Sequence, residues 1–198
     1  MTATLANLNV IKIMKTMQPP CLIIATLLTV VLGAVPLGAE EIRAPGRRMG
    51  TYDSRVVAYA WFWSDTHQRQ LKELVQSARI ARAAGQTNHW QELDAALRRQ
   101  QDDLHRQVFS TAPASDALAA IQERIPEIEK QAGVFVLVSQ WDDQALRRYQ
   151  DAGKVDVTDR LVQEFKPSEK QLKVIAGLKK QKPLPLPQCD ELIRKGRI

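Results

Sequence analysis

The stretch at residues 133–138 most constrains the fold, because five consecutive apolar residues, Val134-Phe135-Val136-Leu137-Val138, carry no charge. Four of these five residues are β-branched or aromatic, which is typical of a short strand buried on both faces. Gly133 suits the position just after the last turn of a preceding helix. The sequence therefore predicts a helix followed by the central strand of a sheet.

Two weaker strands are predicted at residues 49–53 and 154–157. Both have too little apolar surface to stand alone, so we expect them to pair beside the stretch at 133–138. Nearly all other segments show the spacing of amphipathic helices. The expected fold class is α+β: a small three-stranded sheet with a projecting antiparallel helical hairpin and flanking helices.

The first 39 residues have the pattern of a secretory signal peptide. They contain no acidic residue, and Lys12 and Lys15 precede an apolar run at residues 21–32. Ala39 supplies a small residue for a cleavage site. An uncleaved membrane anchor is the alternative, although the run is shorter than the roughly 20 residues that a spanning helix needs. We expect export to the periplasm or cell envelope.

Charge divides the remaining chain into two regions. Residues 40–165 carry seventeen basic and nineteen acidic residues, a net charge of −2, whereas residues 166–198 carry nine and three, a net charge of +6. The second region is predicted to be a basic helix followed by a Pro-rich tail. It could contact an anionic envelope surface or remain solvated. No nucleic-acid partner is expected, because the aromatic residues are separated from this basic segment.

The tail also holds a cysteine and a proline-rich stretch. Cys21 lies in the predicted signal, so Cys189 has no partner within the mature chain. It is expected to be a free thiol in a loose tail or to pair between chains. Residues 183–187 alternate proline and leucine, which favours a stiff linker and leaves open a site for a proline-reading partner.

Two long amphipathic segments predict the hairpin at about residues 65–108. Gly85 separates them, and such a short connection makes the helices antiparallel. A further seam begins near residue 115 and is interrupted by Pro126, where the helix either kinks or restarts. Ser168 and Gln171 match a capping box for a later helix. The aromatic run at residues 61–63 favours core or subunit interface over a ligand platform.

No catalytic constellation is visible in the sequence. His67, His89 and His105 are far apart and lack zinc-ligand spacing. The pair Asp142 and Asp143 is better read as a turn or helix cap than as a metal site, because other oxygen ligands are missing nearby. Ser54 is likewise read as a cap, since no glycines flank it as in a nucleophile elbow. We expect no enzyme activity, no cofactor and no metal; a secreted enzyme is the remaining alternative.

The order of elements resembles the Skp/OmpH family of periplasmic chaperones over residues 47–165. The residues that carry the resemblance are the first strand with its short helix, the hairpin, the strand at 133–138 and the ending Val155-Asp156-Val157-Thr158-Asp159. The resemblance implies a homo-oligomer, possibly a trimer, whose hairpins hold unfolded or outer-membrane proteins. An envelope-associated scaffold that docks through the basic tail is the alternative function.

This resemblance assigns two groups of residues. The candidates for the core or the assembly interface are Tyr52, Val57, Trp61, Phe135, Leu137, Val155 and Val157. The candidates for the client-facing side of the hairpin are Leu71, Leu74, Trp90, Leu93 and Leu97.

Overall fold

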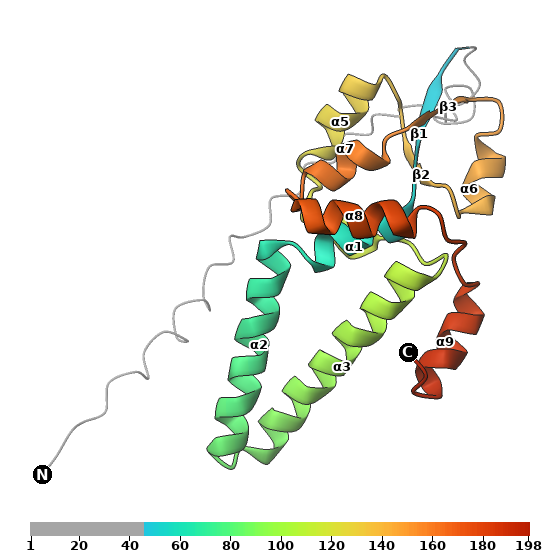
Figure 1. The fold of residues 1–198 in the computed structure, drawn as a ribbon. Helices are drawn as coiled ribbons and strands as arrows, with labels where there is room; N and C mark the ends of the chain where they lie inside the picture. Colours follow the sequence, from blue (N-terminus) through green and yellow to red (C-terminus); the bar gives the residue numbers. More distant parts are fainter. Residues whose placement is uncertain (1–45) are drawn as a thin grey trace, which may run out of the picture. The chain divides into compact units, whose positions relative to one another are not determined.

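The computed structural model describes residues 46–198 (Figure 1). The predicted signal at residues 1–39, with Cys21, lies outside the described residues. Within them the chain forms one three-stranded sheet and a larger set of helices. The predicted α+β class is confirmed.

The sheet is entirely parallel, with strand order β2-β1-β3. Its strands are β1 (Arg48–Tyr52), β2 (Leu137–Ser139) and β3 (Gly153–Asp156). Gly50 is aligned with Leu137 on one side and with Val155 on the other. The prediction that the stretch at 133–138 supplies the central strand is therefore wrong. That position belongs to β1, and β2 is an edge strand.

Gly50 explains how a weakly apolar segment becomes the centre of the sheet. A Cβ atom built on Gly50 would lie 2.8 Å from Leu137 Cδ2 and 3.2 Å from methyl groups of both Val134 and Val157. Neighbouring side chains close over the backbone of β1 only because this side chain is missing. Met49, next along the strand, is fully buried.

The apolar stretch before β2 forms strand-like contacts before the regular strand begins. Phe135 N donates to Arg48 O at 3.1 Å, and Gly50 N donates to Val136 O at 2.9 Å. Phe135, Val136 and Leu137 are only half-buried. The predicted burial on both faces is therefore wrong for this part, because an edge strand is covered less completely than a central one.

Helix α1 (Ser54–Phe62) follows β1 directly and is buried along almost its whole length. Its N-cap is Asp53, whose carboxylate accepts from Arg55 N at 3.1 Å, and not Ser54 as the sequence suggested. Ser54 Oγ instead donates to Ala112 O at 2.9 Å. Helix α1 thereby joins the sheet to the chain that returns from the hairpin.

The hairpin consists of α2 (Asp65–Ala83) and α3 (Thr87–Phe109), which contact each other and run side by side away from α1 in Figure 1. Gly85 has φ +69° in the connecting turn, a conformation that glycine adopts without strain. At 1.5 Å per residue the helices are about 28 and 35 Å long. Ser64 caps α2, whereas α3 starts without a side-chain cap.

Four short helices follow the hairpin along the chain: α4 (Ser115–Ala120), α5 (Ile125–Ala132), α6 (Asp143–Arg148) and α7 (Thr158–Gln163). Pro126 lies in the first turn of α5, so the chain restarts a helix there and does not kink. Gly133 ends α5 in the left-handed conformation, with φ 63°. Asp142 caps α6 by accepting from Ala145 N at 2.9 Å, which confirms the cap reading of this aspartate.

The C-terminal segment is folded. Helix α8 (Glu169–Leu178) begins with the predicted capping box of Ser168 and Gln171 and packs on α1, and α9 (Leu186–Arg194) packs on α3. Between them Leu184 pairs with the end of the hairpin: its N–H donates to Phe109 O and its carbonyl accepts from Thr111 N. The prediction of a loose Pro-rich tail is wrong.

Candidate functional site

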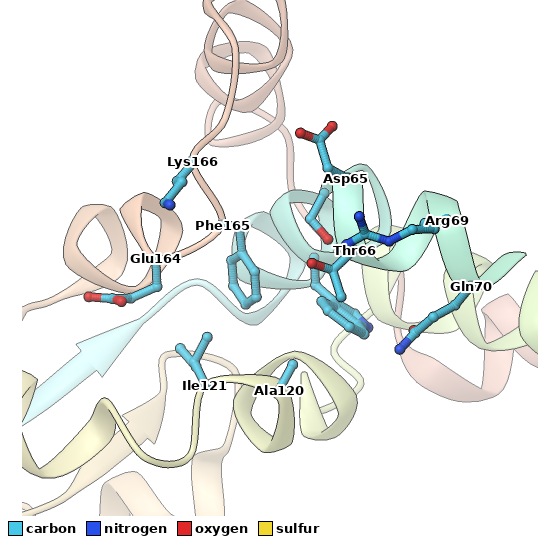
Figure 2. A pocket seen from close by; sticks show the side chains of 11 residues that line it. Asp65, Thr66, Arg69, Gln70, Ala120, Ile121, Glu164, Phe165 and Lys166 are labelled. Atoms are coloured by element: carbon cyan, nitrogen blue, oxygen red, sulfur yellow. The ribbon is translucent and has the colours of Figure 1, made fainter.

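A hollow of about 550 Å³ lies where three distant segments meet beside the start of α2 (Figure 2). The end of α1 and the first turns of α2 form one wall. The end of α4 and the residues after α7 form the other walls of the hollow. The lining residues are Trp61, Ser64, Asp65, Thr66, Arg69, Gln70, Ala120, Ile121, Glu164, Phe165 and Lys166.

Aromatic and aliphatic side chains form the floor of the hollow. The Phe165 ring lies 5.9 Å from the Trp61 ring, measured between centroids, and Ile121 is buried. In Figure 2 Phe165 lies centrally, with Ile121 and Ala120 beneath it. An apolar group placed here would be removed from water against three hydrophobic side chains.

Two cations stand on opposite sides of this floor, Arg69 on the α2 side and Lys166 beyond Phe165 (Figure 2). Within residues 46–198 neither side chain has an ion-pair partner, whereas Glu164 is bound by Arg124 Nε at 3.1 Å. The Asp65 carboxylate points away from the floor in Figure 2. The charge accessible in the hollow is therefore basic, and the hollow suits an apolar group that lies next to an acidic one.

Lys166 adopts φ 51°, the left-handed region that non-glycine residues avoid. This conformation follows α7 directly and turns the chain from Phe165 toward α8. It costs about 1–2 kcal/mol relative to an ordinary conformation. Nothing in the local sequence shows that Lys166 is left-handed, so this rim could not be predicted from the sequence.

A second polar cluster lies at the carboxyl end of β1, where parallel sheets commonly bind ligands. Asp53 and Arg55 form a buried ion pair, with Arg55 Nη2 2.8 Å from Asp53 Oδ2 and Nε 3.1 Å from Oδ1. Trp141 Nε1 also donates to Asp53 Oδ1, at 3.0 Å, and its ring lies under the Arg55 guanidinium. Arg55 Nη1 donates to Gln181 O at 2.9 Å.

This cluster holds the chain together and is not an open site. Asp53 is 4% exposed and Arg55 1% exposed, and both side chains have partners within the chain. Thr158 Oγ1 accepts from Asp53 N at 3.0 Å and donates to Asp156 Oδ1 at 2.6 Å. The network therefore links β1 to the segments after β2 and β3 and to the end of α8. The network was not predictable from the sequence, because nothing local shows that Arg55 is buried.

The core candidates lie at different depths. Val57 and Val157 are fully buried and Tyr52 nearly so, and burial raises the pKa of Tyr52 to about 12, with a smaller contribution from Asp142. The candidates that pack against the core while only partly buried are Trp61, Leu137 and Val155. Phe135 lies outside the core cluster, at the sheet edge, between the Arg47 guanidinium and the Tyr149 ring.

The hairpin candidates are all half-buried: Leu71, Leu74, Trp90, Leu93 and Leu97. Leu71 and Leu97 line one cavity between α2 and α3, and Trp90 lies beneath the Arg82 guanidinium. Leu71 and Leu97 thus share an internal surface of the hairpin. The hollow of Figure 2 was not anticipated, because its lining comes from segments about 100 residues apart in the sequence.

Cys189, expected in a loose tail, is fully buried where α9 meets α3, and its thiol lies 3.6 Å from His105 O. Burial raises its pKa, with a further contribution from Asp190. The thiol is free, as expected, but the expected loose tail around it is wrong. The helix that carries it is anchored by an ion pair between Arg106 Nε and Asp190 Oδ1 at 2.7 Å.

Residues 46–198 contain no group of three or more histidine, cysteine or acidic side chains placed to hold a metal ion. None of the helices in the same range is long and apolar enough to cross a bilayer. Comparison of the chain with protein-family models, with curated proteins and with solved structures gave no match.

Proposed function

We propose that the protein is an exported, non-enzymatic binding protein of the cell envelope, Skp/OmpH-like, that holds unfolded or outer-membrane polypeptides. The observation that carries the proposal is the hairpin of α2 and α3, inserted between β1 and β2, with the basic and apolar hollow at its base. The resemblance found in the sequence supports the same function through its element order. Export rests on the signal-like pattern of residues 1–39.

The hollow supports polypeptide binding because it combines two kinds of interaction. Trp61, Ile121 and Phe165 offer an apolar floor, and Arg69 and Lys166 stand beside it without ion-pair partners in the described part of the chain. An unfolded segment presents apolar and acidic side chains together, and such a segment could satisfy both. Charges on the rim would speed the encounter more than they tighten the complex.

Aggregation of an unfolded outer-membrane protein, followed by light scattering, tests the proposal. The wild-type protein is expected to suppress the aggregation, and the double variant Arg69→Gln/Lys166→Gln to suppress it less at equal concentration. Arg79→Gln is the matched control, since Arg79 is exposed on the same helix outside the hollow. Failure of the wild-type protein to suppress aggregation would remove the holdase role.

Assembly into a homo-oligomer, with a trimer as the form that the resemblance implies, is part of this proposal. It is supported by the sheet, in which β2 and β3 each pair on one side only within residues 46–198. Unpaired strand edges can accept a strand from another copy. Sedimentation of the protein without residues 1–39 tests it, and a single monomeric species at micromolar concentration would exclude assembly.

A second candidate function, docking on an anionic envelope surface, is supported by the outer face of α8. Lys170, Lys173 and Lys180 are exposed on or beside this helix, next to Leu172 and Val174. Val174 is 45% exposed. Exposed basic side chains and exposed apolar ones on the same helix favour contact with anionic lipid headgroups.

Charge substitution tests docking better than truncation, because removing α9 would uncover the apolar surface around Cys189. The wild-type protein is expected to pellet with vesicles that contain anionic lipid. It should remain in the supernatant when Lys170, Lys173 and Lys180 are replaced by glutamine. The control changes three exposed lysines elsewhere, Lys72, Lys130 and Lys154. Equal loss in both triple variants would show only a dependence on net charge and would argue against a docking face.

A further inference from the structure

A cavity of about 290 Å³ lies between α2 and α3 where the hairpin leaves α1. Its lining is mostly apolar, and it consists of Phe62, His67, Leu71, Leu97, Gln100, Gln101 and Leu104. Gln101 is exposed to solvent, so the cavity has a wall at the protein surface. A cavity of about 150 Å³ accommodates benzene, so this one has room for a bicyclic aromatic molecule.

Two polar side chains line the cavity without hydrogen-bond partners. Gln100 Oε1 is buried and accepts no hydrogen bond. His67 is 7% exposed, and within residues 46–198 neither nitrogen of its ring has a hydrogen-bond partner. A buried polar atom without a partner destabilises the fold, and Gln100 Oε1 is such an atom. Nothing within the described fold compensates this cost.

The surroundings of His67 hold it in place. Its ring contacts the edges or faces of Trp61 and Phe62, with centroid distances of 5.1 and 4.9 Å. Burial lowers its pKa, and Asp116 opposes that shift. A neutral imidazole offers one acceptor and one donor, and the Gln100 carbonyl oxygen adds a second acceptor.

We propose that this cavity is a binding site for an aromatic ring that bears one N–H or O–H donor, of the indole or phenol type. The ring occupies the apolar volume, and its donor meets Gln100 Oε1 or the acceptor nitrogen of His67. Such a group occurs in free aromatic molecules and in tryptophan and tyrosine side chains. This proposal is independent of the proposed client binding, because the binding of a free ligand to the cavity can be measured without any client.

Calorimetric titration with indole, paired with 1-methylindole, tests the site. The two ligands have nearly the same shape, and only indole has a donor. Indole is expected to bind about fivefold or more tightly than its methylated form, the ratio that one neutral hydrogen bond provides. Equal affinities, or no binding of indole at millimolar concentration, would overturn the proposal.

Gln100→Met removes the unpartnered acceptor while keeping the length and helix propensity of the side chain. The unliganded variant is expected to melt about 2 °C or more above wild type, because the buried orphan is gone. The same variant should lose the preference for indole over 1-methylindole. Gln91→Met, at an exposed position of the same helix, should change neither quantity. An unchanged preference in Gln100→Met would contradict the role of its oxygen.

N-acetyltryptophanamide distinguishes the two sources of the ring. If it displaces indole, the site admits tryptophan side chains of polypeptides. If indole binds and is not displaced, the site is restricted to free aromatic molecules. Leu97→Phe, which fills the cavity from α3, should abolish indole binding in either case, and retained binding in this variant would place the ligand elsewhere.

Discussion

The buried ion pair between Asp53 and Arg55 allows a quantitative prediction from a single substitution. Asp53→Asn keeps the shape of the side chain and its ability to cap α1, because asparagine is as good an N-cap as aspartate. It removes the negative charge and replaces Oδ2 with a donor amide. That amide then faces Arg55 Nη2, which was 2.8 Å from the oxygen.

The expected cost follows from the burial of both partners, whose side chains are only 2% and 5% exposed. Removing one partner of a buried pair leaves an uncompensated charge and costs about 3–5 kcal/mol. For a chain of this size that lowers the melting temperature by about 6–20 °C. Adding Arg55→Met should recover part of the loss, because the orphaned guanidinium is then removed.

Urea unfolding followed by circular dichroism measures the free energy of unfolding of these variants. The matched control is Asp94→Asn, the same substitution in the exposed pair of Asp94 and Arg98 on α3. That pair should contribute less than about 1 kcal/mol. If Asp53→Asn also cost less than about 1 kcal/mol, the pair would be hydrated in solution and the reasoning from burial would fail.

Four further predictions concern single positions. Gly50→Ala should lower the free energy of unfolding by about 1–3 kcal/mol, since its Cβ would overlap Leu137, and urea titration measures it. Lys166→Gly should raise it by about 0.5–1 kcal/mol in the same assay, because glycine adopts the left-handed conformation without strain; a loss would show that the lysine side chain contributes more than its backbone costs. Burial lowers the pKa of His67. Its contribution to stability is therefore complete above its ordinary pKa of about 6.5 and is lost as pH falls through the lower pKa of the folded state. Replacing His67 with glutamine should flatten the dependence of the free energy of unfolding on pH below about pH 6.5. Cys189 should react with a thiol reagent only at the rate at which α9 opens, and immediate reaction in native buffer would contradict its burial.

Local chemistry in the sequence predicted where many elements begin and end. The capping box at Ser168, the left-handed glycine at Gly133 and the interruption at Pro126 each depend on residues within one turn. The hairpin was predictable for the same reason, because its apolar spacing is contained in each helix. These features need no knowledge of the rest of the fold.

The strand order could not be read in the same way. The apolar stretch at 134–138 predicted the most buried strand, yet burial depends on what covers a strand from both sides. β1 is covered because Gly50 lets Val134, Leu137 and Val157 approach its backbone. This fit involves residues about 85 and 105 positions away, which no local pattern contains.

The tail and the hollow failed to appear in the sequence for a related reason. Proline-rich composition predicts an extended segment but not that Leu184 will bond to Phe109 and Thr111. The hollow needs residues from three segments to meet. Lysine at a left-handed position is visible only once the backbone is known.

The parallel pairing of β1 also determines the order in which the chain can fold as it is synthesised. Both neighbours of β1 lie more than 80 residues downstream, at Leu137–Ser139 and Gly153–Asp156. The hairpin of α2 and α3 uses contacts between sequence neighbours and can form as soon as those helices emerge. β1 therefore stays unpaired, with its backbone groups open to other strands, until most of the chain has left the ribosome.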